Sequence, residues 1–206
     1  MKGSKKALTA DNPPRGRGMT KPMQALSASV IVAFCTLCSR AHELWLNHLE
    51  LFDNNPRLTE LMNSAAKAEL VRLSIMSQEY SLLQIVKLHD KAVINVNVTL
   101  GIDFVLKYGG WSDSVRLRLE ELKKQLDDFT DKELRGARNK ILSHYDLATI
   151  VSDATLGTFA DGDDEKYFKA LQEFVNIVHD QVVRGPYPFN KLVKNDIAYF
   201  LRTIKP

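Results

Sequence analysis

The sequence predicts an all-α protein, a bundle of long antiparallel helices with additional short helices packed around them. Three observations support this fold class. Apolar residues recur at helical spacing through most of the chain after residue 23. The stop signals DNNP, YGG and RGP fall at the ends of these periodic stretches, and only the short stretch NVNV alternates like a strand. With 206 residues, 45% of them hydrophobic, the chain can form one substantial core.

The first 23 residues differ from the rest of the chain. They hold Pro, Gly and basic residues without periodicity, so we expect a flexible basic tail before a helical domain over residues 24–206. Six basic residues and one acidic residue give this tail a charge of +5, and the remaining 22 basic and 24 acidic residues leave the domain at −2. The overall charge of +3 therefore does not indicate nucleic-acid binding, which must rest on a local cluster.

The first helix is expected over residues 24–53. Its apolar positions at helical spacing are Val30, Phe34, Leu37, Ala41, Leu44, Leu51 and Phe52. The apolar run over residues 25–38 is too short to span a bilayer, and no signal-peptide cleavage site is obvious in the SRAHELW that follows. We therefore expect no membrane insertion. Cys35 and Cys38 are expected to pack as small apolar side chains, which fits a reducing cytoplasm.

The second helix is expected to start at Pro56, which suits a first helical turn, and to run to about His89. The next stretch, NVNVTLGIDFVLKYGG, is interpreted as a short helix over residues 98–107 that is closed by Gly109 and Gly110. A strand at the start of this stretch is the alternative, because β-branched residues there alternate with Asn.

Two capping signals define the following helices. Ser112 is a suitable N-cap for a helix that carries an apolar line through residues 115–129. The sequence TDKE has the form of a capping box, so a new helix is expected to start at Thr130. After an interruption over residues 151–165, one further helix runs to RGP, and a last helix is expected over residues 189–203.

The helix expected to start at Thr130 carries the stretch ARNKILSHYD. On an ideal helix, Arg138 lies roughly 55° to one side of the apolar stripe and His144 roughly 60° to the other, about 9 Å apart along the axis. Both side chains can reach a groove beside the packed face, but they point away from each other. A two-fold axis between two copies of the helix could bring the Arg of one copy toward the His of the other. We therefore expect a composite cleft at a homodimer interface.

This pair of side chains suits RNA cleavage without a metal ion. A histidine with a near-neutral pKa can exchange a proton with a 2′-hydroxyl or a leaving oxygen, and a guanidinium can hold the charge that grows on the phosphate. The nine residues 132–140 also carry a local charge of +3. The alternative stays open that Arg138 packs its stem along the stripe and His144 is a half-buried packing residue.

The stretch RNKILSHYD resembles the R-x4-6-H motif of the HEPN superfamily, with a polar residue after the Arg. The order of the helices and the segment LHDKAVINVNVTLGIDFVL are most similar to abortive-infection-type HEPN proteins of prokaryotes. This resemblance implies a cytoplasmic, homodimeric, metal-independent endoribonuclease, a toxin or phage-defence effector that acts on RNA, needs no cofactor and has a cognate antitoxin as a candidate partner. Arg138, Asn139 and His144 would be its catalytic residues, and the residues expected to support RNA binding are Lys140, Arg135 and Lys132.

Two other interpretations compete with this one. The stretch HELWLNH places His42 and His48 six residues apart, whereas a helical zinc motif needs histidines four apart, so both are expected to be helix-flank residues and no metal site is predicted. From a different functional class, the chain could be a non-catalytic helical binding protein, antitoxin-like or a scaffold, that uses the same face for dimerisation.

Overall fold

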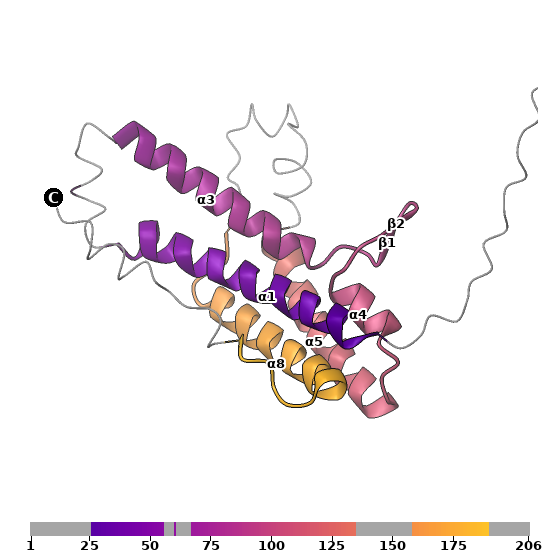
Figure 1. Cartoon of the computed structure of the whole chain (residues 1–206). Helices are drawn as coiled ribbons and strands as arrows, with labels where there is room; N and C mark the ends of the chain where they lie inside the picture. Colours follow the sequence, from indigo (N-terminus) through magenta and orange to yellow (C-terminus); the bar gives the residue numbers. More distant parts are fainter. Residues whose placement is uncertain (1–25, 56–59, 61–66, 135–157, 190–206) are drawn as a thin grey trace, which may run out of the picture.

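The computed structural model describes residues 26–55, 60, 67–134 and 158–189, and it confirms the all-α fold class (Figure 1). The helices are α1 (Ala28–His48), its π-helical continuation η1 (Leu49–Asp53), α3 (Lys67–Lys87), α4 (Ile102–Tyr108), α5 (Asp113–Glu133) and α8 (Asp163–Val183). Two short strands, β1 (Val93–Ile94) and β2 (Asn97–Val98), form an antiparallel hairpin. The predicted basic tail, the start of the second helix at Pro56 and the last helix beyond Phe189 lie outside these residues.

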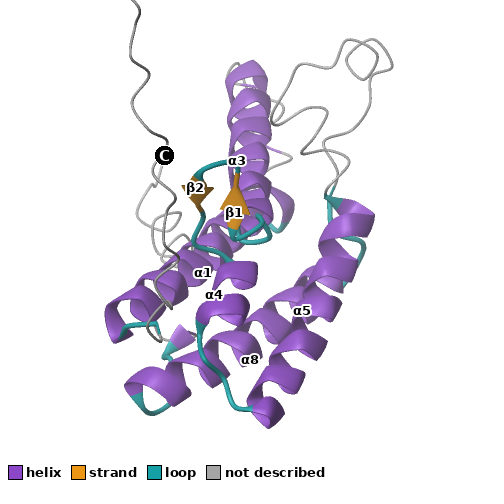
Figure 2. Ribbon diagram, turned by 90° about the vertical axis from the view of Figure 1, so that its right-hand side faces the viewer, coloured by secondary structure: helices purple, strands orange, loops and turns teal. Residues whose placement is uncertain are grey.

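Helix α1 is the centre of the bundle. It packs against α3 on one side and α8 on the other, α8 packs in turn against α5, and α4 packs against α5 (Figures 1 and 2). The rings of Phe34 on α1 and Phe174 on α8 meet edge to face with centroids 6.0 Å apart, and both residues are 0% exposed. Burying such large aromatic side chains supplies much of the free energy that holds helices together.

The two cysteines confirm the prediction of apolar packing. Cys35 and Cys38 lie on the inner face of α1, are 0% exposed and form no disulfide. Burial raises the pKa of Cys35 to about 12 and raises the pKa of Cys38 well above its usual value. Both thiols are therefore protonated at neutral pH and are part of the core rather than a reactive site.

The expected helix start at Val98 is wrong, and the strand alternative is correct at this point. Val93 pairs with Val98 across a two-residue turn in which Asn95 has a φ of 56°, a left-handed conformation that asparagine tolerates well. The alternating β-branched residues favour this hairpin, which projects beside α4 (Figures 1 and 2). Helix α4 begins after Gly101 and ends at Tyr108, followed by the predicted glycines.

The helix start predicted at Thr130 is also wrong. Helix α5 continues without a break from Asp113 to Glu133, so Thr130 lies inside it. The Thr130 hydroxyl does not cap a new helix but donates to the carbonyls of Leu126 and Asp127 in the preceding turn, each over 3.1 Å. The residues DDF before Thr130 include no helix-breaking residue, so the preceding helix continues through the TDKE pattern instead of ending before it. Ser112 does occupy the N-cap position of α5.

Helix α8 agrees with the prediction. Its first turn holds Asp163, Asp164 and Glu165, which the positive end of the helix dipole favours, and the helix stops at Arg184 and Gly185, both with positive φ. Throughout the described ranges, no helix combines the length and apolar character needed to cross a bilayer.

Candidate functional site

The residues that the sequence indicates for RNA cleavage lie in or beside the segment that follows α5. Lys132 lies in the last turn of α5, and only its backbone is described. The other five fall within residues 135–157, outside the described part of the chain: Arg135, Arg138, Asn139, Lys140 and His144. The structure therefore neither brings these side chains together nor separates them, and the composite cleft stays a prediction.

The structure does define the end of α5 from which this segment continues. The backbone N–H of Leu134 donates to the carbonyl of Thr130 over 2.9 Å, and the Leu134 side chain is 1% exposed. Thr130 itself is 2% exposed. A buried side chain with a hydrogen-bonded backbone fixes the chain at this point, four residues before Arg138.

A cluster of polar side chains, which we call the His89 cluster, lies beside this end of α5. It contains His89 just after α3, Asp127 and Lys123 on α5, and Tyr167 on α8. The Nδ1 atom of His89 lies 2.8 Å from an Asp127 oxygen, and its Nε2 atom lies 2.9 Å from the Tyr167 hydroxyl. Lys123 pairs with the other Asp127 oxygen. One imidazole thus connects three helices around the last turns of α5.

The partners of His89 determine which ring nitrogen carries the proton in its neutral form. Burial alone would raise the pKa of Asp127, but hydrogen bonds from His89 and Lys123 and their charges outweigh it, so this pKa is lowered. Asp127 is therefore a carboxylate at neutral pH and accepts a hydrogen bond from Nδ1–H. Burial raises the pKa of Tyr167 well above its usual value, so its hydroxyl keeps its proton and can donate to Nε2.

The cluster is internal. The side chain of His89 is 3% exposed and Tyr167 is 0% exposed, whereas that of Asp127 is 26% exposed. A substrate cannot reach the imidazole without opening the bundle, so the cluster positions helices rather than touching a ligand. No functional role was predicted from the sequence for His89, Asp127 or Tyr167. The sequence did contain one signal for this cluster: Asp127 and Thr130 are polar residues beside the apolar line of α5.

The two histidines of HELWLNH are not simple helix-flank residues. His48 is 2% exposed, and His42 stacks on the rings of Phe168 and Phe189, with centroids 4.2 and 5.3 Å away. Burial lowers the pKa of His42 to about 4, although the charge of Asp164 opposes this shift. His42 is therefore neutral at pH 7. Within the part of the chain that the structure describes, no group of three or more His, Cys, Asp or Glu is arranged to hold a metal ion.

A groove of about 370 Å³ runs along His42 between α1 and the start of α8. Trp45 closes one side of it and donates from Nε1 to an Asp164 oxygen over 2.9 Å. Its charged lining residues are Glu50, Asp164, Glu165 and Lys169, three acidic and one basic. This balance disfavours a polyanion such as RNA.

Comparison with known protein families matches most of the chain to one family. The model of a HEPN family described as AbiU2 matches residues 24–202. No curated protein and no solved structure matches the chain. The matched range includes both the described bundle and the stretch RNKILSHYD.

Proposed function

The chain belongs to the AbiU2 family of HEPN-type abortive-infection proteins, and we propose that it is a metal-independent endoribonuclease that acts as a toxin or phage-defence effector. The observation that carries this proposal is the stretch Arg138, Asn139 and His144, an R-x4-6-H motif inside the matched range. The proposed location is the cytoplasm, where the RNA substrate is found and where two free cysteines stay reduced.

The proposed reaction is a transesterification at phosphorus, in which the 2′-oxygen replaces the 5′-oxygen. His144 takes the proton of the 2′-hydroxyl, the 2′-oxygen attacks the adjacent phosphorus, and the bond from phosphorus to the 5′-oxygen breaks. The imidazolium formed on His144 then gives that proton to the departing 5′-oxygen, so the products are a 5′-hydroxyl end and a 2′,3′-cyclic phosphate end, and His144 returns to its neutral form. Arg138 stabilises the charge on the phosphate oxygens, and Asn139 orients the phosphate or the guanidinium. DNA, which lacks the 2′-hydroxyl, is not cleaved.

The basic residues near the motif support substrate binding in this proposal. Lys140, Arg135 and Lys132 lie in the same short segment as Arg138, so their charges can contact phosphates next to the cleaved bond. This local cluster matters more than the charge of the whole domain. A cognate antitoxin that covers the cluster would silence the enzyme.

The toxin proposal is tested by growth. Expression of the wild-type chain is expected to arrest bacterial growth, and Arg138→Ala or His144→Ala is expected to restore it. Arg116→Ala is the matched control, because Arg116 is an exposed arginine on α5 and should leave toxicity intact. Equal growth with the wild type and all three variants would contradict the toxin proposal.

The proposed homodimer site is tested by mixing inactive protomers. If the Arg of one protomer serves with the His of its partner, a heterodimer of Arg138→Ala and His144→Ala chains contains one intact site. Random mixing should then restore about one quarter of the wild-type rate, since half of the dimers are mixed and each has one of two sites. A mixture as inactive as either variant alone would contradict a shared Arg and His, and a monomer in solution would contradict the dimer itself.

A further inference from the structure

A second concave surface lies away from the His42 groove, where the end of α3 meets α1 and the chain just after β2. This cleft has a volume of about 320 Å³, near the lower end of the usual range for small-molecule sites. Its apolar lining consists of Leu37, Leu88 and Leu100. Its polar lining consists of Arg40, Gln84, Lys87, Asp90 and Thr99. We call it the Arg40 cleft.

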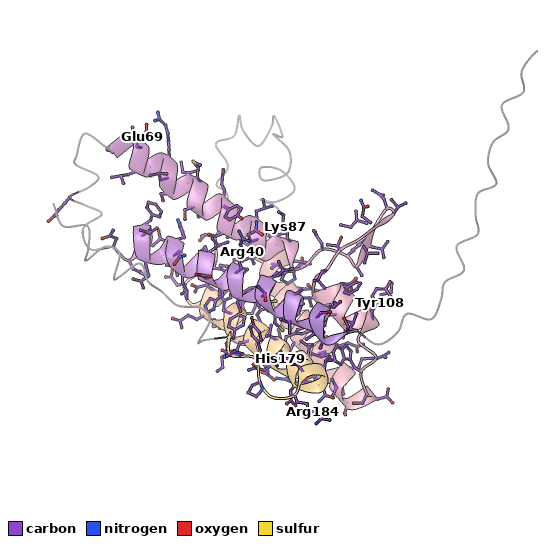
Figure 3. All side chains as sticks on the ribbon, viewed as in Figure 1. Arg40, Glu69, Lys87, Tyr108, His179 and Arg184 are labelled. Atoms are coloured by element: carbon purple, nitrogen blue, oxygen red, sulfur yellow. The ribbon has the colours of Figure 1, made fainter. Side chains whose placement is uncertain are left out.

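Two cations line the cleft, and neither is in an ion pair with a carboxylate of the described residues. Figure 3 shows Arg40 on α1 near Lys87 at the end of α3, and both residues line the cleft. Within the described ranges, neither forms an ion pair, and Arg40 instead donates from Nη2 to the Tyr80 hydroxyl over 3.3 Å. Arg118 on α5, by contrast, is paired with Glu121 and Glu173. The Arg40 cleft therefore presents positive charge to a ligand.

An exposed aromatic ring lies next to these cations. Tyr80 on α3 is 44% exposed, and its hydrogen bond to Arg40 places it beside the cleft. Single-stranded nucleic acids are bound by surfaces that combine cations for the phosphates with aromatic rings on which bases stack. Arg40, Lys87 and Tyr80 supply both elements. The groove along His42 lacks both elements: its charged lining is three acidic residues and one basic residue, and its aromatic residues Trp45 and Phe168 are buried.

We propose that the Arg40 cleft binds a nucleotide of single-stranded RNA outside the cleavage motif. Arg40 and Lys87 contact phosphate oxygens, and the ring of Tyr80 stacks on a base. Asp90 is the one acidic residue among the lining residues, so the cleft keeps a net positive charge. This assignment names a substrate-binding site for the proposed ribonuclease and therefore rests on that function.

The test measures binding of a short, labelled, single-stranded RNA by the full chain carrying His144→Ala, which prevents cleavage. Adding Arg40→Gln and Lys87→Gln is expected to weaken binding by about tenfold or more, and to flatten the dependence of log K on log salt by about 1.4 for two lost phosphate contacts. The matched control is Arg184→Gln with Lys169→Gln, which removes the same charge from two exposed positions, Lys169 on α8 and Arg184 just after α8. Figure 3 labels Arg184. Equal binding by the two double variants would overturn the proposal.

The role of Tyr80 is tested separately from charge. Tyr80→Phe keeps a ring for stacking and loses only the bond to Arg40, so it should bind RNA within about threefold of the parent, whereas Tyr80→Ala should bind about tenfold more weakly. Equal binding by Tyr80→Phe and Tyr80→Ala would contradict stacking. A free nucleoside monophosphate that bound as tightly as the oligonucleotide would contradict the assignment to RNA.

Cleavage by the chain with an intact His144 distinguishes this proposal from the proposed ribonuclease activity. If the parent cleaves RNA, Arg40→Gln with Lys87→Gln should raise KM and leave kcat nearly unchanged, since the cleft does not touch the reacting atoms. If this double variant had an unchanged KM and an unchanged Kd for RNA, the proposed RNA-binding role of the cleft would be wrong, whereas the proposed ribonuclease activity would be unaffected. Loss of RNA binding by this double variant, in a chain that never cleaves RNA, would support the cleft and contradict the ribonuclease.

Discussion

Replacing His89 by alanine is expected to destabilise the bundle more than any surface change. The substitution removes both hydrogen bonds of the imidazole, 2.8 Å to Asp127 and 2.9 Å to the Tyr167 hydroxyl. Tyr167 is 0% exposed, so its hydroxyl is left without a partner and without water, which costs about 1–3 kcal/mol. Asp127 loses less, because Lys123 still pairs with it. Together with the lost packing of a buried ring, we expect the free energy of unfolding to fall by about 3 kcal/mol.

The assay is urea unfolding at pH 7, followed by circular dichroism. The matched control is Lys124→Ala, which removes a surface ion pair with Asp128 and should change stability by no more than about 0.5 kcal/mol. Tyr167→Phe removes only the hydroxyl and should cost about 1–2 kcal/mol, and the double variant should cost less than the sum of the two single variants. If His89→Ala and Lys124→Ala unfolded at the same urea concentration, the structural role of the His89 cluster would be refuted.

Three further predictions concern other parts of the chain. His42 has a pKa of about 4 in the folded state, below its unfolded value of 6.5. Neutral His42 therefore contributes up to about 3 kcal/mol of stability above pH 6.5, and this contribution is lost as the pH falls toward 4. His42→Phe should therefore unfold less readily than wild type at pH 5, as measured by urea titration, and a parallel loss in both proteins would contradict this. Gly101→Ala places a Cβ atom 2.7 Å from the carbonyl oxygen of Leu88, so the free energy of unfolding should fall by about 1–3 kcal/mol. Thermal unfolding measures this loss, and an unchanged Tm would contradict the close approach. Arg138→Lys keeps the charge but loses the planar donor pair, so kcat for RNA cleavage should fall by about tenfold to a hundredfold, and an unchanged kcat would argue against a guanidinium at the phosphate.

Helical periodicity predicted most of the described bundle correctly. The helix predicted after residues 151–165, with its end at RGP, corresponds to α8, because that helix buries one apolar face and is followed by a glycine. The two wrong helix starts arose where local signals competed. At Thr130 a capping pattern was overridden by helix continuation, because the buried hydroxyl finds carbonyl acceptors in the preceding turn. At Val98 the hairpin was preferred, because Asn95 adopts a left-handed turn conformation.

The candidate site was predictable only where function leaves a local pattern. Arg138 and His144 lie six residues apart on one short stretch, so a motif reveals them. The His89 cluster joins residues 38 and 78 positions apart in the chain, and the Arg40 cleft joins two helices with the chain after β2. No spacing rule connects such residues before the helices are packed, because their proximity depends on tertiary structure.

The central claim is that Arg138 and His144 cleave RNA without a metal ion. Labelled single-stranded RNA incubated in EDTA with the wild-type chain, with His144→Ala and with the exposed control Arg116→Ala tests it most directly. Cleavage by the wild type and the control, none by His144→Ala, and products ending in a 2′,3′-cyclic phosphate are the predicted results. Equal cleavage by wild type and His144→Ala, cleavage of a 2′-deoxy substrate, or no cleavage of several RNAs by the wild type would contradict the claim.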